Sequence, residues 1–262
     1  METSEFTYSI SQLSTGYRRG GQVKCLAKGL CAGLRRGELT CLIGVNGAGK
    51  STLLRTMAGL QPALEGEVLL NGRRLKEYSQ KQLSRTVAVV LTDEIVEQNL
   101  TARELVAMGR MPYTSYWGGL TADDKRIVAE SIAMVGMSDF AERRIGSLSD
   151  GEKQKLLIAK ALAQNTDVIL LDEPVAFLDF PSKVSVLRLL SRVARESGKS
   201  VLLSIHDIEL SLQVSQRLWI LNGGDFVEGE PAQLAQEGRI DFLFEGEGIR
   251  FDREKLQYNL EV

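Results

Sequence analysis

The stretch LTCLIGVNGAGKSTLLRTMAGL at residues 39–60 decides the fold. Residues 39–43 are apolar and β-like, residues 44–51 match G-x-x-x-x-G-K-[ST] at every fixed position, and a helical pattern continues to about Leu60. In such a loop, glycines let backbone N–H groups point inward at phosphate oxygens, and the following helix adds its positive N-terminal dipole. We therefore expect a nucleotide-binding loop whose contacts come from Asn46, Gly47, Ala48, Gly49, Lys50, Ser51 and Thr52. Within it, Lys50 is expected to reach the outer phosphates and Ser51 to offer its hydroxyl to Mg²⁺.

A second chemical motif is the stretch VILLDEP at residues 168–174, an apolar strand that ends in two acids. Ligand chemistry in α/β sheets gathers where strands end. We expect Asp172 to lie in the outer shell of Mg²⁺ and Glu173 to act as the base that polarises an attacking water. The alternative is a solvated turn after a buried strand, and the complete phosphate loop favours the catalytic interpretation.

The composition is that of one large α/β unit. The chain has 262 residues. Its net charge of −2 gives no support to a nucleic-acid-binding protein with a broad basic surface. Cys25, Cys31 and Cys41 have neither zinc-site nor disulfide spacing and are interpreted as reduced thiols. The polar start at residues 1–5 does not resemble a secretory signal, and the apolar runs are too short to span a bilayer, so we expect a soluble protein.

Short β-like runs alternate with longer helical ones, which predicts a mainly parallel sheet flanked by helices. From about residue 100 to residue 164 the β-like runs stop, and capping-box patterns begin at Thr101 and Thr121. This predicts an inserted helical subdomain at about 100–164. The expected organisation is one domain at 1–229, with 230–262 as its C-terminal extension.

Between the two chemical motifs lies LSDGEKQK at residues 148–155, just before a helical run. With its flanking motifs it resembles the ATP-hydrolysing subunit of ABC transporters, whose signature is usually LSGGQ. The resemblance extends from about Ser9 to about Gly229. It implies an α/β P-loop core, an N-terminal antiparallel β subdomain, the inserted helical subdomain, and ATP with Mg²⁺ as cofactors. It also implies a head-to-tail dimer holding two ATP molecules, in which Ser149 and Gly151 close over the ATP of the other subunit.

The resemblance assigns three further residues. Asp179, in VAFLD at residues 175–179, corresponds to the acid of the family's D-loop. His206, the only histidine, follows a strand as the family's switch histidine does, so it is expected to bond the γ-phosphate and to orient Glu173. Tyr17 lies where the family has an aromatic ring that stacks on adenine, with Tyr8 as a competitor.

Two departures from the family pattern are visible. Asp150 and Glu152 replace the usual Gly and Gln of the signature, which adds repulsion near a γ-phosphate unless Asp150 caps the helix instead. The family's glutamine after the strand at residues 87–91 is missing. Asp93 lies at about that position and is expected to reach Mg²⁺, whereas Gln98 is the nearest glutamine.

The stretch at residues 104–121 is similar to the matching part of ATPases that serve importers of iron–siderophore, haem and cobalamin. The alternative is that Trp117 and the tyrosines only pack the insertion or dock a generic partner helix. The importer resemblance implies three features: a polytopic membrane permease with, indirectly, a substrate-binding protein as partners, no binding to nucleic acid, and a position on the cytoplasmic face of the cell membrane.

Two functions of other classes are the alternatives. A soluble ABC ATPase for iron–sulfur cluster assembly stays open. An ABC protein acting on DNA or ribosomes is disfavoured, because the chain holds one cassette and no long coiled-coil insertion.

Overall fold

The computed structural model describes residues 6–20, 22–91, 98–114, 119–222, 225–244 and 249–260. Its centre is a six-stranded sheet in the order β10-β9-β3-β8-β7-β6, in which every pair is parallel except β9 with β10. The strands alternate with helices along the chain, as the sequence predicts. The sheet consists of β3 (Leu39–Gly44), β6 (Val87–Val90), β7 (Val168–Leu171), β8 (Ser200–Ser204), β9 (Arg217–Asn222) and β10 (Asp225–Gly229).

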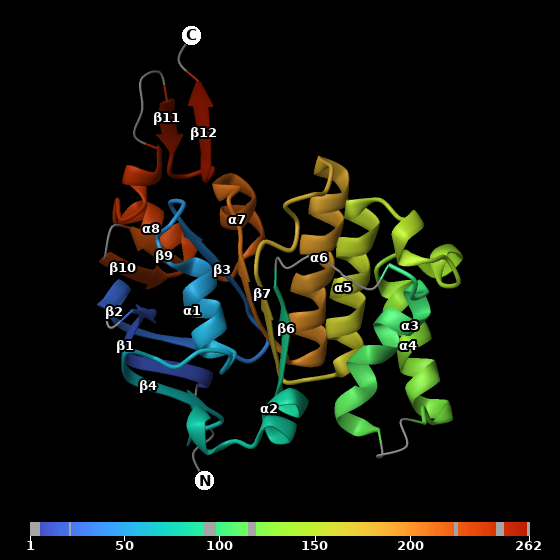
Figure 1. The fold of residues 1–262 in the computed structure, drawn as a ribbon. Coiled ribbons are helices and arrows are strands. Elements are labelled where there is room, and N and C mark those ends of the chain that lie inside the picture. Colours follow the sequence, from blue (N-terminus) through green and yellow to red (C-terminus); the bar gives the residue numbers. More distant parts are fainter. Residues whose placement is uncertain are drawn as a thin grey trace.

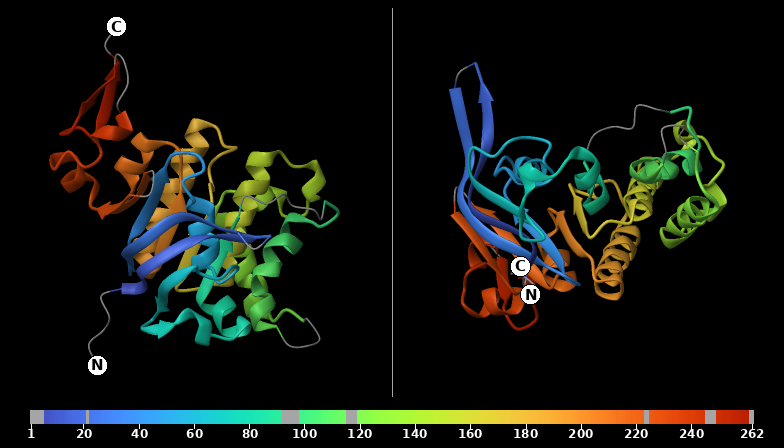
Figure 2. Two further views of the ribbon diagram at one scale, coloured as in Figure 1. Left: turned by 60° about the vertical axis from the view of Figure 1, so that its left-hand side comes forward. Right: turned by 90° about the horizontal axis from the view of Figure 1, so that it is seen from below.

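A second, four-stranded antiparallel sheet in the order β2-β1-β4-β5 packs beside the first. Figure 2 shows β1 and β2 as a long hairpin. Helix α1 (Lys50–Met57) lies between the two sheets, because its Leu53, Leu54 and Met57 share one buried cluster with residues of both. The sheet and the two short helices after it are β1 (Phe6–Arg19), β2 (Gln22–Arg35), β4 (Glu65–Leu70), β5 (Arg73–Arg74), η1 (Leu75–Glu77) and α2 (Gln80–Thr86).

The region after β6 is helical as far as Gln164 in the part of the chain that the structure describes. It projects from the side of the core sheet in Figure 1. Both predicted capping boxes are present, at Thr101 with Glu104 and at Thr121 with Asp124. Its elements are α3 (Ala102–Ala107), η2 (Met108–Tyr113), α4 (Ala122–Met134), η3 (Ser138–Phe140), η4 (Ile145–Ser147) and α5 (Asp150–Gln164).

The helical region is tied to the core by polar contacts at the base of β6. The side-chain amide of Gln164 donates to the carbonyl oxygens of Ser84 and Val87, at 2.6 and 3.1 Å. Arg85 Nε donates to the carbonyl oxygen of Pro112 at 2.9 Å. These contacts fix the far end of α5 against the strand β6, and so they help to position the N-terminus of α5.

The C-terminal third completes the core sheet and adds a small hairpin. Helix α6 (Phe180–Ser197) begins after the N-cap Asp179 and ends at Gly198, whose φ of 62° is left-handed. Figure 1 shows the hairpin of β11 and β12 near the C-terminus, beyond α8. Among the helices that the structure describes, none combines the length and apolar character needed to cross a membrane. The remaining elements are α7 (Ile208–Val214), α8 (Pro231–Gln236), η5 (Asp241–Phe244), β11 (Ile249–Asp252) and β12 (Gln257–Leu260).

Candidate active site

The glycine-rich loop connects β3 to α1 and has the backbone conformation that a phosphate cradle needs. Gly47 and Gly49 have φ angles of 81° and 100°, in the left-handed region that residues with a side chain rarely adopt. Gly49 is the N-cap of α1, so no side chain caps this helix. The positive end of α1 is therefore directed at whatever the loop encloses.

Lys50 lies folded over this loop, and its side chain is almost fully buried. Its Nζ donates to the carbonyl oxygens of Gly44 and Val45, at 2.8 and 3.3 Å. Burial lowers the pKa of the Lys50 ammonium, and the nearby carboxylates of Glu173 and Asp172 offset part of that effect. The structure thus brings the loop lysine together with both acids of the second motif, although they are far apart in sequence.

The loop forms one wall of a hollow of about 400 Å³, whose other wall is the β2 segment 25–28. Tyr17 lies on the adjacent strand β1, opposite Lys24, whose Nζ is 5.8 Å from the centre of the ring. The Tyr17 ring is exposed. Tyr8 is fully buried and bonds the carbonyl oxygen of Met57, so it has no free ring face for a base. Of the two tyrosines, Tyr17 is the one whose ring is accessible.

The two acids follow β7 at the carboxyl edge of the core sheet. The backbone N–H of Asp172 donates to the carbonyl oxygen of Val90 on β6 at 2.8 Å, and its side chain is buried. His206 follows the end of the neighbouring strand β8. Its Nε2 lies 2.7 Å from Glu173 Oε1. Four predicted residues, Lys50, Asp172, Glu173 and His206, thus gather at one edge of the sheet, as the parallel strand order requires.

One residue of this group was not predicted from the sequence. Ser204 lies between the two acids, with its Oγ 2.7 Å from Asp172 Oδ1 and 2.8 Å from the backbone nitrogen of Glu173. Its sequence signal is weak: a polar residue that ends a strand after three apolar residues, two residues before His206.

The signature stretch forms the N-terminus of α5, where Ser149 is the N-cap. The Ser149 hydroxyl lies 2.8 Å from Glu152 Oε2, and the backbone N–H of each residue bonds the side chain of the other. These bonds from the backbone and hydroxyl of Ser149 lower the pKa of the Glu152 carboxyl. The alternative that Asp150 caps the helix is therefore wrong, because the first residue inside a helix cannot take the N-cap position. Its exposed carboxylate pairs with Lys153 at 3.1 Å instead.

Gly151 brings the signature helix close to the segment after Glu173. A Cβ added at Gly151 would lie 3.2 Å from Leu178 Cδ2, tighter than most packed contacts. Asp179 follows this segment and caps α6, accepting a hydrogen bond from the Ser182 backbone N–H at 2.9 Å. Hydrogen bonds from the Ser182 hydroxyl and backbone lower the pKa of Asp179. Within the described residues no hydrogen bond or ion pair joins Ser149 or Asp179 to Lys50, Glu173 or His206.

Two sequence-based expectations lie outside the described residues. Asp93 falls in the segment 92–97 that follows β6, and Trp117 falls in the segment 115–118. For both, the sequence-based interpretation stays a prediction.

Comparison with known proteins identifies the family to which this chain belongs. A family model described as "ABC transporter" matches residues 27–176, which is more than half of the chain. The chain belongs to the ABC transporter family. It is therefore an ATPase of the ABC type, and the fold class predicted from the sequence is confirmed.

Several relatives are named as ATP-binding proteins of import or transport systems. The chain is 37% identical over 220 residues to the iron(3+)-hydroxamate import ATP-binding protein FhuC of Bacillus subtilis, a match that covers 84% of this chain and 80% of that protein. It is 31% identical over 234 residues to the ferric enterobactin transport ATP-binding protein FepC of Escherichia coli, covering 89% and 85%. The cobalamin import ATP-binding protein BtuD of Halobacterium salinarum is 39% identical over 193 residues, covering 74% and 48%.

Solved structures of the family have the same fold. A dimeric bacterial ABC transporter cassette matches with a TM-score of 0.76 and 25% identity, covering 86% of this chain and 98% of that one. A putative metal-chelate type ABC transporter in an inward-facing conformation matches with a TM-score of 0.77 and 23% identity, covering 97% and 96%. The second match covers a larger share of this chain than the first.

Proposed function

We propose that this chain is the ATP-hydrolysing subunit of an importer that carries an iron complex, such as a siderophore or haem, or cobalamin through a separate membrane permease. The observation that carries the ATPase assignment is the 2.7 Å contact between Glu173 and His206 beside Lys50 and Asp172. The importer assignment is supported by relatives named for iron(3+)-hydroxamate import, ferric enterobactin transport and cobalamin import. These relatives favour the importer over a soluble ATPase of iron–sulfur cluster assembly.

In the proposed mechanism the loop amides and Lys50 hold the phosphates of ATP. The ammonium of Lys50 exchanges its carbonyl partners for phosphate oxygens, which are stronger acceptors because they are charged. Tyr17 stacks on the adenine. When bound with ATP, Mg²⁺ supplies positive charge that neutralises the phosphate oxygens. The hydroxyl of Ser51 in the first turn of α1 and the buried carboxylate of Asp172 would hold it, since Mg²⁺ takes oxygen ligands, and we propose Asp93 as a further ligand.

Hydrolysis itself falls to Glu173 and His206. Glu173 takes a proton from water as the water oxygen attacks the γ-phosphorus, and the bond from phosphorus to the bridging oxygen of ADP breaks. His206 holds the Glu173 carboxylate by the 2.7 Å contact. In this proposal it also bonds the γ-phosphate of the bound ATP. The contact with Glu173 needs a proton on Nε2, because a carboxylate only accepts, so a hydrogen bond to the γ-phosphate would use a second ring N–H or share the first.

The working unit that we propose is a head-to-tail dimer of this chain with two ATP molecules at its interface. Ser149, Gly151 and Asp179 then act on the ATP held by the second copy, which fits the lack of bonds from Ser149 and Asp179 to the catalytic residues within the described part of the chain. The match to a dimeric cassette supports this assembly. The dimer would dock on the cytoplasmic face of a polytopic permease, with a substrate-binding protein as an indirect partner and residues 230–262 as an extension of the ATPase domain 1–229.

The test is affinity purification of the tagged chain from its own cells in mild detergent, followed by uptake measurements. We expect a polytopic membrane protein to co-purify. We also expect a strain carrying only the Lys50→Ala chain to lose uptake of one labelled cargo among a ferric siderophore, haem and cobalamin. Recovery of soluble partners alone, with all three uptakes intact, would reject the importer and favour the assembly role.

Removing the loop lysine should weaken nucleotide binding. Lys50→Ala deletes a charge-assisted contact to phosphate, and we expect ATP to bind about 10- to 100-fold more weakly. Lys199→Ala is the matched control, because Lys199 Nζ also bonds a carbonyl oxygen, that of Thr166 at 2.6 Å, and burial also lowers its pKa. Titration with a fluorescent ATP analogue measures both. Unchanged affinity in Lys50→Ala would contradict the loop assignment.

Removing the signature hydroxyl should damage turnover without affecting binding to one subunit. Ser149→Ala is expected to lower turnover about 10-fold, because the partner's ATP loses one hydrogen bond, while ATP affinity of the monomer stays unchanged. The variant also loses an N-cap, which costs about 1 kcal/mol of stability. Ser79→Ala removes an equivalent capping box from α2 and should lose similar stability while turnover stays normal. Equal turnover in both variants would rule out the role of Ser149.

A further inference from the structure

We infer that Ser204 is a positioning residue for ATP hydrolysis, which holds Asp172 and the backbone of Glu173 in their working arrangement. The inference rests on the proposed function, since it presupposes that Glu173 is the base. Ser204 is the last residue of β8, and its side chain is fully buried. Strand β8 lies next to β7, and the pairing of Leu171 with Leu203 places Ser204 beside Asp172.

The Ser204 hydroxyl is both a donor and an acceptor of hydrogen bonds. Its Oγ donates to Asp172 Oδ1 at 2.7 Å and accepts from the Glu173 backbone N–H at 2.8 Å. A hydroxyl has one proton to give and lone pairs to receive, so one side chain serves both acids at once. An apolar residue at this position would leave the buried Asp172 oxygen and the Glu173 N–H without these partners, which is costly for buried polar groups.

Glu173 needs such support because its backbone is in an unfavourable conformation. Its φ angle is 50°, in the left-handed region where a residue with a long side chain is uncommon. The sheet pairing ends one residue earlier, at the bond from the Asp172 N–H to the Val90 carbonyl oxygen. From Asp172 onward the chain turns out of the strand, and the bond to Ser204 is what holds the Glu173 N–H at the turn.

The consequence of this turn is the direction of the Glu173 side chain. Its carboxylate reaches His206 Nε2 at 2.7 Å, and His206 is only two residues after Ser204 on the same chain segment. Ser204 and His206 therefore hold Glu173 at its two ends, the backbone N–H and the carboxylate. A base must be held within hydrogen-bond reach of its water, so losing one of these two contacts should slow the chemical step more than it weakens nucleotide binding.

The experiment compares Ser204→Ala with Ser200→Ala in the full-length chain. Ser200 is the matched control, because it is also fully buried on β8 and bonds Thr7 Oγ1 at 3.0 Å and the Arg35 carbonyl oxygen at 2.9 Å, but it lies at the other end of the strand. For Ser204→Ala we expect kcat to fall about 10-fold while KM and the affinity for ATP change less than about 3-fold. ATP-bridged dimer should persist longer, since its hydrolysis is slower. Ser200→Ala should lower the unfolding midpoint with kcat unchanged.

Glu173→Gln is measured alongside, so that the two assignments can fail separately. If Glu173→Gln is inactive and Ser204→Ala keeps wild-type kcat, Ser204 has no positioning role. A positioning role is also rejected if both serine variants lose kcat equally, or if Ser204→Ala loses ATP binding as strongly as kcat. Wild-type turnover in Glu173→Gln would instead overturn the assignment of the base itself.

Discussion

Glu173→Gln is expected to bind ATP with nearly normal affinity while turnover falls about 10²- to 10⁴-fold. The amide has the shape of the carboxylate and still reaches His206, but it cannot take a proton from water. Lys50, the glycine-rich loop and Asp172 are untouched, so the phosphates keep their partners. Because hydrolysis is what would release the dimer, the variant should accumulate as an ATP-bridged dimer. Single-turnover hydrolysis and size-exclusion chromatography with and without ATP measure the two effects.

The matched control for this substitution is Glu142→Gln. Glu142 is an exposed carboxylate in the helical region that pairs with Arg103 at 2.6 Å, so the same chemical change there leaves the acid pair as it is. We expect turnover in Glu142→Gln to be normal. A Glu173→Gln variant that hydrolyses ATP as fast as this control would show that the base lies elsewhere. A variant that also fails to bind ATP would show that the residue serves binding rather than the chemical step.

The parts of this site that the sequence could predict are those with local signals. The loop glycines, Lys50 and Ser51 lie within one short motif, and the chemistry of a phosphate cradle fixes their spacing. The capping boxes at Thr101 and Thr121 are equally local, so they too could be predicted within the helical region. Asp172 and Glu173 could be placed because a parallel sheet brings strand ends to one edge.

What the sequence could not predict depends on contacts between distant segments. The role of Ser204 needs β7 and β8 to be neighbours, which sequence order alone does not give. The resemblance favours Tyr17 over Tyr8, but the burial of Tyr8, which removes the competitor, comes from packing α1 against the antiparallel sheet. The capping role considered for Asp150 is wrong because Ser149 takes the N-cap position of α5. Ser149 and Glu152 form a capping box there, in which each side chain accepts from the backbone N–H of the other.

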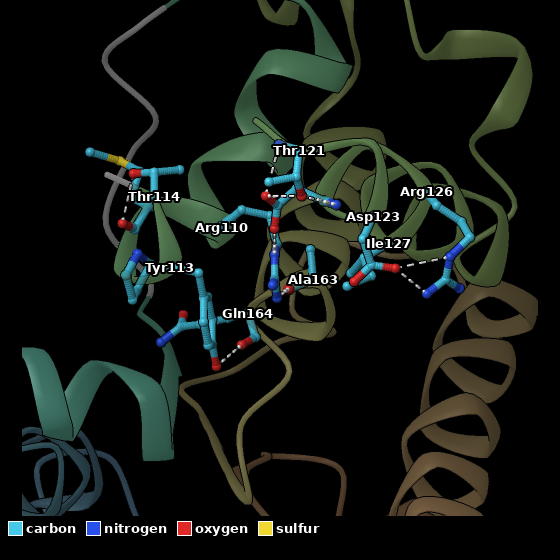
Figure 3. Close-up of polar contacts among 12 residues, drawn as sticks. Arg110, Tyr113, Thr114, Thr121, Asp123, Arg126, Ile127, Ala163 and Gln164 are labelled. Carbon is cyan, nitrogen blue, oxygen red and sulfur yellow. Dashed lines mark hydrogen bonds and ion pairs between the residues drawn. The ribbon is translucent and has the colours of Figure 1, made fainter. Parts of the chain in front are cut away.

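The helical region contains a buried ion pair that the sequence also does not reveal. Figure 3 shows Arg110 reaching from η2 toward the start of α4. Its Nε donates to Asp124 Oδ1 at 2.8 Å, and its Nη1 donates to the carbonyl oxygen of Ala163 at 2.8 Å. The Tyr113 ring lies over the guanidinium, with 4.1 Å between the ring centre and Cζ. The sequence pattern predicts Asp124 only as a capping residue, yet the same carboxylate also neutralises a buried cation.

Breaking this pair should cost far more stability than breaking an exposed one. Asp124→Asn keeps the shape of the side chain but leaves the Arg110 guanidinium buried without its counter-charge, and we expect a loss of about 3–5 kcal/mol in the free energy of unfolding. The control is the next residue toward the N-terminus, Asp123, which pairs with Arg126 at 2.6 Å with side chains 65% and 59% exposed. Asp123→Asn should cost less than about 1 kcal/mol. Urea unfolding of both variants at neutral pH measures the difference, and equal losses would mean that burial does not control the pair.

The pH dependence of the same difference separates charge from shape. Hydrogen bonds from the Thr121 hydroxyl and from Arg110 lower the pKa of Asp124 from its ordinary 3.8 to about 2. A carboxyl whose pKa is lower in the folded protein than in the unfolded chain contributes stability that is fully present above the unfolded pKa and is lost as pH falls toward the folded one. The gap in unfolding free energy between the wild-type protein and Asp124→Asn should therefore be constant from pH 7 to about pH 5, and it should shrink between about pH 4 and pH 2. A difference that stays constant down to about pH 2 would mean that Asp124→Asn is destabilised because the amide cannot make the hydrogen bonds of the carboxylate. The charge of Asp124 would then not be what stabilises the buried Arg110.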